Sequence, residues 1–165
     1  PYDRGVGRAI EVERSSVLSA PADEVWRHAT SMAGVNDELM PWVRMTHPPE
    51  LGSLADAADT ALGTVVFHSW LLAGGRVPFD RHALRLVEIE TREDGGSFVE
   101  QSTSWMQSQW RHERDVVPLG ADRCMVTDRL TVVPRAPFAR PLVAVVVPWL
   151  FTRRHRRLVE RFGAG

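Results

Sequence analysis

Residues 65–105 read VVFHSWLLAGGRVPFDRHALRLVEIETREDGGSFVEQSTSW. Two breaks that contain glycine, Gly74-Gly75 and residues 93–96, separate runs rich in β-branched and aromatic residues. The loops between these runs are far shorter than the dozen or more residues that a parallel connection needs. We therefore expect an antiparallel meander here. Its three strands are predicted at residues 65–73, 79–90 and 98–105.

Further strands are predicted on both sides of this stretch. The segment 118–122 has turn-forming residues between two more runs, and an N-terminal run ends at Pro21, which favours the first turn of a helix. Gly34 and Asn36 should end or interrupt that helix. A long loop at residues 48–63 should contain a short helix. The additional strands are expected at residues 12–19, 39–46, 110–117 and 123–133.

The chain after Pro137 has the spacing of a long helix with one buried face. Pro148 should kink or split this helix. The apolar residues on the predicted face are Phe138, Leu142, Val145, Val146, Trp149, Leu150, Leu158 and Phe162. The whole pattern predicts an α+β fold, in which seven antiparallel strands curve around a long C-terminal helix and two short helices follow the first strand.

Length and charge favour one ordinary globular domain over residues 1–165, with 20 basic and 21 acidic side chains. This balance gives no reason to expect nucleic acid as the partner. The longest apolar stretch, residues 141–151, is about half of what a membrane span needs, so no integral membrane segment is expected. The first ten residues lack the apolar run of a signal peptide, which indicates a cytoplasmic protein. Both a monomer and a homodimer remain open.

Three motifs resemble the START and polyketide-cyclase superfamily, also called SRPBCC or helix-grip proteins. The first is the opening Ser-Ala-Pro-Ala-Asp-Glu-Val-Trp at residues 19–26. The second combines Trp110-x-His112 with residues 127–130, and the third is residues 151–158. The resemblance covers residues 10–163 and implies a helix-grip fold. Because this superfamily includes carriers, receptors, cyclases and oxygenase domains, the resemblance does not choose one function.

The polar side chains best suited to catalysis lie on one pair of facing strands. If the hairpin after residue 117 is centred on Gly120, His112 lies opposite Asp128 on the inward face, and Arg114 lies opposite Val126. A carboxylate beside an imidazole fixes its tautomer and suits it for acid or base catalysis. A purely structural pair, or a polar anchor for a ligand, is the alternative. The predicted catalytic residues are His112, Asp128 and Arg114.

A pocket for a small molecule is predicted between the sheet and the last helix, because apolar walls with a few polar groups are typical of such sites. Residues 65–73 are expected to present Val66, His68 and Trp70 inward. The opposite orientation of residues 98–105, with Val99, Thr103 and Trp105 inward, stays open. The predicted ligand-binding residues are Val66, His68, Trp70, His82, Leu84, Leu86, Ser102, Ser104, Trp110, His112, Asp128 and Trp149. No short spacing of histidines or cysteines indicates a metal site, and no cofactor is predicted.

Three functions follow from these observations. The first is binding of a small hydrophobic, ring-containing molecule, with access gated by the loop at residues 48–63. The second is a polyketide cyclase or dehydratase, with His112 as the base, Asp128 orienting it and Arg114 stabilising an enolate. The third is an interaction domain that uses the basic cluster of residues 153–157 on the last helix.

Overall fold

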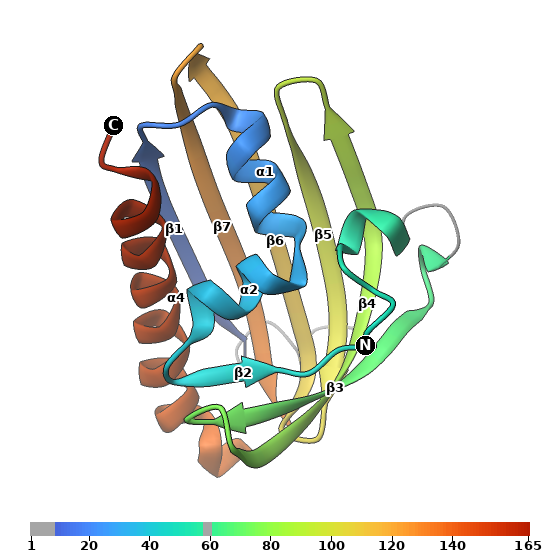
Figure 1. The fold of residues 1–165 in the computed structure, drawn as a ribbon. Helices are drawn as coiled ribbons and strands as arrows, with labels where there is room; N and C mark the ends of the chain where they lie inside the picture. The colour runs from blue at the N-terminus through green and yellow to red at the C-terminus, as the bar shows by residue number, and fades with distance from the viewer. Residues whose placement is uncertain (1–8, 58–60) are drawn as a thin grey trace, which may run out of the picture.

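The computed structural model describes residues 9–57 and 61–165, and it confirms the predicted α+β helix-grip architecture. Seven antiparallel strands form one curved sheet in the order β1-β7-β6-β5-β4-β3-β2. Figure 1 shows α1, α2 and α4 on the same side of this sheet. The elements are β1 (Ile10–Leu18), α1 (Ala22–Thr30), α2 (Met32–Leu39), β2 (Val43–Met45), η2 (Leu54–Ala57), β3 (Val65–Ala73), β4 (Val77–Arg92), β5 (Gly95–Ser104), β6 (Gln107–Gly120), β7 (Arg123–Pro134), η3 (Pro137–Ala139) and α4 (Arg140–Phe162).

The structure corrects the prediction for the segment that joins α1 to β2. Gly34 and Asn36 lie inside α2 and do not end a helix. The break falls at Ser31, whose extended backbone ends α1 and whose hydroxyl oxygen accepts a hydrogen bond from the Gly34 amide at 2.9 Å, which caps α2. The predicted strand at residues 39–46 is much shorter. The short helix of the long loop is η2, and residues 58–60 lie outside the described residues.

The β6–β7 hairpin has a different register from the predicted one. Its turn is formed by Ala121 and Asp122, because Gly120 pairs with Arg123. Arg114 therefore lies opposite Asp128, and His112 lies opposite Leu130. The shift is two residues, so every side chain keeps its predicted face of the sheet.

The apolar core consists of two clusters. The larger one includes Trp26, Leu86 and Leu158, and it lies between the sheet and the C-terminal part of α4. The smaller one includes Val132 and Phe151, and it lies beneath the N-terminal part of α4. Burial of these side chains stabilises the fold by about 25 cal/mol for each Å² of apolar surface removed from water.

The buried face of α4 differs from the predicted one. Of the eight predicted residues, Leu158 is buried, whereas Phe138, Leu142, Val145, Val146 and Trp149 are exposed. Trp149 packs edge-on against Trp42 instead, with ring centroids 5.3 Å apart. The helix runs through Pro148 without being split. The side chains that α4 buries are Val143, Val147, Phe151, Arg154, His155 and Leu158.

No helix among the described residues combines the length and the apolar character that crossing a membrane requires.

Candidate functional site

A series of polar side chains crosses the concave face of the sheet, with members from four adjacent strands. His82 Nε2 on β4 lies 2.6 Å from Glu100 Oε1 on β5. Glu100 accepts a second hydrogen bond from Ser102 at 2.6 Å, and its Oε2 lies 3.7 Å from His112 Nδ1 on β6. His112 Nε2 lies 2.8 Å from Asp128 Oδ1 on β7. All five side chains are buried.

Asp128 is the branch point of this series. Its Oδ2 lies 3.0 Å from His155 Nε2 on α4, and His155 Nδ1 lies 2.8 Å from the Ser16 hydroxyl on β1. Arg114 donates from Nε and Nη2 to the two carboxylate oxygens of Asp128, each at 2.7 Å. The contact between His112 and Asp128 therefore exists, but as a diagonal neighbour across the β6–β7 pair.

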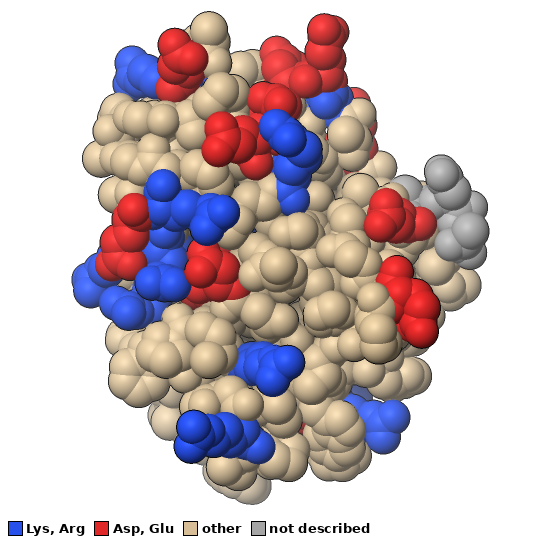
Figure 2. Space-filling model, in the orientation of Figure 1, with Lys and Arg blue, Asp and Glu red and all other residues tan. Residues whose placement is uncertain are grey.

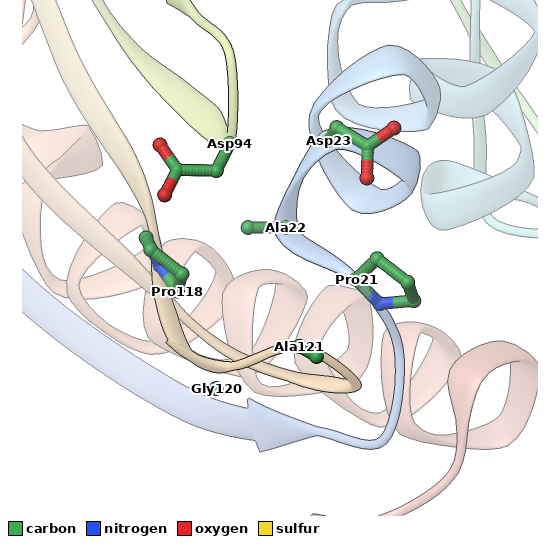
Figure 3. Close-up of a pocket in the computed structure, with 7 residues that line it drawn as sticks. All are labelled: Pro21, Ala22, Asp23, Asp94, Pro118, Gly120 and Ala121. Atoms are coloured by element: carbon green, nitrogen blue, oxygen red, sulfur yellow. The ribbon is translucent and has the colours of Figure 1, made fainter.

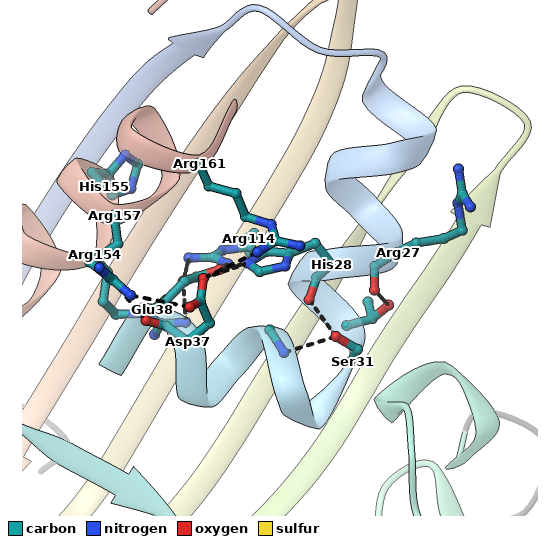
Figure 4. Close-up of polar contacts among 12 residues, drawn as sticks. Arg27, His28, Ser31, Asp37, Glu38, Arg114, Arg154, His155, Arg157 and Arg161 are labelled. Carbon is teal, nitrogen blue, oxygen red and sulfur yellow. Dashed lines mark hydrogen bonds and ion pairs between the residues drawn. The ribbon is translucent and has the colours of Figure 1, made fainter. Parts of the chain in front are cut away.

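Glu38 on α2 connects this series to the helices (Figure 4). Arg114 donates from Nη1 and Nη2 to the two oxygens of Glu38 at 2.8 and 2.9 Å, and Arg154 on α4 donates from Nε at 2.9 Å. The paired charges thus join α2, α4, β6 and β7. We call the connected groups the polar array. Its members are Glu38, His82, Glu100, His112, Arg114, Asp128, Arg154 and His155.

The three carboxylates of the array are held in the charged form. Burial alone would raise the pKa of each, because a charge is poorly solvated inside a protein. At Asp128 the Arg114 guanidinium outweighs burial and lowers the pKa well below its ordinary value. Arg114 and Arg154 lower the pKa of Glu38 in the same way. At Glu100 the imidazoles of His112 and His82 lower the pKa.

The array brings together an unusual number of buried ionisable groups. Three carboxylates and two guanidinium groups lie within it, next to three imidazole rings. Buried ion pairs add little net stability, because desolvation offsets their attraction, and apolar side chains of similar volume often serve as well. The array is therefore the best candidate for a functional site.

His82 is a member of the array in which only one of the two ring nitrogens is hydrogen-bonded to the described residues. Its Nε2 is held by Glu100, while its Nδ1 forms no hydrogen bond with any residue that the structure describes. The ring of half-buried Trp110 lies edge-on to it, with centroids 6.1 Å apart. His112, in contrast, has Asp128 and Glu100 near its two nitrogens and lies edge-on between Phe98 and Phe151.

A family model described as "Domain of unknown function (DUF8410)" matches residues 16–162. The chain belongs to the DUF8410 family. No curated protein sequence matches the chain.

Solved structures show that the DUF8410 chain has the START or helix-grip fold. A START superfamily protein from Mycobacterium smegmatis superposes with a TM-score of 0.62 at 12% identity, over 92% of this chain and 96% of that one. The Zhui aromatase/cyclase from Streptomyces sp. R1128 superposes at 0.65 and 16% identity, over 93% of both chains. Norcoclaurine synthase from Thalictrum flavum superposes at 0.55 and 16% identity, over 96% and 93% of the two chains. At such low identity the likeness extends to the fold alone.

The inward faces of β4, β5 and β6 in the DUF8410 chain are those that the sequence predicted. His82, Leu84 and Leu86 are buried on β4. Ser102 and Ser104 are buried on β5, so the alternative orientation of that strand is wrong. Whether these residues bind a ligand stays a prediction.

The inward face of β3 is the opposite of the predicted one. Phe67 and Ser69 are buried, whereas His68 is exposed on the outer face. Trp70 lies there too, beneath the Arg81 guanidinium. A register irregularity between Val65 and Phe67 contributes to this difference. Val66 packs at the edge of the core, but the irregularity interrupts the alternation there, so the residues after it do not share a face with Val66 in the simple order.

Three hollows on the surface of the DUF8410 chain are lined by residues outside the array. One of about 450 Å³ lies between the start of α1 and two hairpins, where Figure 3 shows small side chains with Asp23 and Asp94. A second of about 530 Å³ lies between α1, α2 and the end of α4, and a third of about 400 Å³ lies beside Arg140. None of these three is the predicted pocket between sheet and helix.

His28 borders the second of these hollows. Its Nε2 is buried without a hydrogen-bond partner, at 3.9 Å from a carboxylate oxygen of Asp37 and of Glu38. Burial lowers the pKa of His28, so it is neutral over most of the physiological range. Among residues 9–57 and 61–165, no group of three or more His, Cys, Asp and Glu side chains is arranged to hold a metal ion.

Two of the four arginines in the basic cluster on α4 form ion pairs within the fold. Arg154 is buried against Glu38, and Arg157 pairs with Asp37 and Glu160. Arg154 and the adjacent His155 are therefore buried within the protein and do not face solvent.

Four members of the array were missing from the predicted site, and one of them, Glu100, lies on the same face of β5 as the predicted Ser102 and Ser104. Arg154 and His155 lie within one of the motifs of the family resemblance, which is the signal that could have found them. Glu38 gave no such signal, because an acidic residue on a short helix is usually solvent-exposed.

Proposed function

We propose that the chain binds a small, hydrophobic, ring-containing molecule on the concave face of the sheet, with a polar group of that molecule hydrogen-bonded to His82. The observation that supports this most is the state of the His82 ring. One nitrogen is held by Glu100 at 2.6 Å, while the other forms no hydrogen bond with the described residues. An imidazole that is held in place through one nitrogen can form a hydrogen bond through the other with a hydroxyl or carbonyl group.

The surroundings of His82 suit a flat ligand. Trp110 offers an aromatic edge and face, and Phe151 lies next to it with ring centroids 6.2 Å apart. On either side of His82 the pairing brings in the small side chains of Ser69 and Ser104. Binding must open space on the concave face, and the least displacement is needed where side chains are this small.

Naphthol and naphthalene form a matched pair of probes, because only naphthol has a hydroxyl group. Naphthol should raise the melting temperature of the protein and bind more tightly than naphthalene. His82→Phe should weaken naphthol binding about five- to tenfold and leave naphthalene unchanged, as expected for one lost hydrogen bond. His68→Phe on the outer face is the control. An unchanged affinity for naphthol in His82→Phe, or no binding of either probe, would refute the proposal.

A second candidate is an acid-base enzyme of the cyclase or dehydratase type. The contact of 2.8 Å between His112 and Asp128 favours it, together with the continuous series from His82 to His155. In this candidate His82 exchanges a proton with the substrate, because both nitrogens of His112 already face carboxylate oxygens. Arg114 is not suited to stabilise an enolate, since its N–H groups already point at Asp128 and Glu38.

Deuterium exchange into α-tetralone, a ring-containing ketone that forms an enolate, tests this candidate. The protein should accelerate exchange at the carbon beside the carbonyl group, and Glu100→Gln should reduce the rate by at least about tenfold. Exchange no faster than in buffer would exclude the enzyme while leaving the binding proposal intact.

A further inference from the structure

The N-terminal half of α4 presents an apolar side to solvent. Its side chains are spaced by three and four residues, so they lie along one face of the helix. Phe138 precedes them and is 89% exposed, and Val145 is 69% exposed. Trp42, just before β2, packs edge-on against Trp149 with centroids 5.3 Å apart. We call this the exposed apolar face. Its members are Trp42, Phe138, Leu142, Val145, Val146 and Trp149.

The end of the molecule that carries this face is basic. Hydrogen bonds and ring contacts bring its segments together: Gly74 N donates to Trp42 O, and Arg135 N donates to Met106 O. Residues 39–49, 64–79, 101–112 and 129–150 of these segments contain no aspartate or glutamate, and the neighbouring start of β1 adds one exposed carboxylate, Glu11, opposite Thr131. Figure 2 shows blue atoms among tan ones over β2 and the end of β3, whereas red atoms lie higher on this face, including over the start of β3. The exposed arginines at this end are Arg44, Arg76, Arg135 and Arg140.

This charge pattern selects among the partners that could cover an apolar face. In a symmetric dimer the same arginines would face one another, and like charges oppose association. An anionic phospholipid surface matches both properties, because apolar and tryptophan side chains enter the boundary between head groups and acyl chains while arginines contact the phosphates. We propose that this end of the molecule docks on an anionic phospholipid membrane through the exposed apolar face and its arginine rim.

Vesicle co-sedimentation tests the proposal directly. The protein should bind vesicles of phosphatidylglycerol mixed with phosphatidylcholine, and bind pure phosphatidylcholine vesicles at least about tenfold more weakly. Added salt should weaken binding to the mixed vesicles, because it screens the arginines. A protein that stays in the supernatant with mixed vesicles overturns the proposal.

Two variants separate docking from folding. Val145→Glu should reduce partition to mixed vesicles by at least about tenfold, whereas the control Leu119→Glu, at a 48% exposed residue on the β6–β7 hairpin, should bind like the wild type. Arg140→Glu places a negative charge at the N-terminus of α4, which the helix dipole favours, so weaker binding cannot be ascribed to helix loss.

Some outcomes would assign the face to another partner. If Val145→Glu binds vesicles as well as Leu119→Glu does, the apolar face is not the docking site. If the wild type is a stable dimer at assay concentration and Val145→Glu is a monomer, the face is an interface between copies. Either result overturns the membrane proposal and leaves the ligand-binding proposal untouched.

Discussion

The two halves of α4 reverse the usual relation between polarity and burial. Residues 140–150 expose Leu142, Val145 and Trp149, whereas residues 151–162 bury Arg154 and His155. The same rigid helix thus turns apolar side chains to water at one end and charged side chains to the core at the other. The comparison shows that burial of a side chain depends on the partners that the fold supplies.

The C-terminal half has its partners within the chain. Glu38 accepts from Arg154 and Asp128 faces His155, so these two buried side chains are compensated. The N-terminal half has no corresponding cover among the described residues. Its exposed apolar side chains add little to the stability of the isolated chain, which is why we look for their role in binding outside it.

The largest expected effect comes from breaking the compensation in the C-terminal half. Arg114→Met leaves Asp128 and Glu38 buried with too few positive partners, and it should lower the free energy of unfolding by about 3–5 kcal/mol. Urea unfolding followed by circular dichroism measures it. Arg111→Met on the outward face of the same strand, where the ion pair with Glu113 is partly exposed, should cost less than about 1 kcal/mol. Equal losses in the two variants would show that the array is not the charge-compensating unit described above.

The next largest effect is expected from a comparison of two aromatic residues that lie two positions apart on α4. Phe151 is buried in the smaller apolar cluster, so Phe151→Ala should lower the free energy of unfolding by about 3 kcal/mol. Trp149 is 45% exposed, and Trp149→Ala should cost about 1 kcal/mol or less despite the larger side chain. Thermal unfolding of the two variants compares them, and a greater loss for Trp149→Ala would contradict the assigned faces of α4.

Acidification should act on the C-terminal half through the array. The pKa values of Asp128, Glu38 and Glu100 are lowered in the folded protein. Their stabilising contribution is therefore complete above the unfolded pKa, about 4, and is lost as pH falls below it toward the lowered values. Urea unfolding at a series of pH values should show this loss, and Glu100→Gln should make it shallower. A profile of the same slope in both proteins would remove Glu100 from the array's acid response.

The smallest expected effect is in the N-terminal half. Leu142→Ser replaces an exposed apolar side chain, so the free energy of unfolding should change by less than about 0.5 kcal/mol in solution without lipid. Urea unfolding checks this. A loss of several kcal/mol would mean that Leu142 is covered within the protein, and that the exposed apolar face is smaller than described.

Local patterns were sufficient for much of the fold. Strands β3 to β7 were found because short breaks, most of which contain glycine, separate runs of β-branched and aromatic residues. The inward face of β6 followed from strict alternation, which places His112 correctly whatever the register. The two-residue error in the β6–β7 hairpin was harmless for the same reason. For β5 alternation separated the two faces but left open which one points inward.

Other features could not be read from local patterns. The reversed face of β3 depends on an irregularity between Val65 and Phe67 that the residue types there do not predict. The face of α4 was wrong because its apolar residues nearly encircle the N-terminal half, so helical spacing alone could not choose the side toward the sheet. Glu38 joined the array only through packing of α2 against α4.

The amino-acid sequence determined the element order, the antiparallel meander and the inward position of His82, His112 and Asp128, because these depend on turns and on an alternation of period two. The tertiary structure alone decided which side of α4 is buried and which charges meet. The reason is physical: burying a charge is favourable only when an opposite charge from a distant part of the chain lies within hydrogen-bonding distance, and such encounters exist only in the folded state.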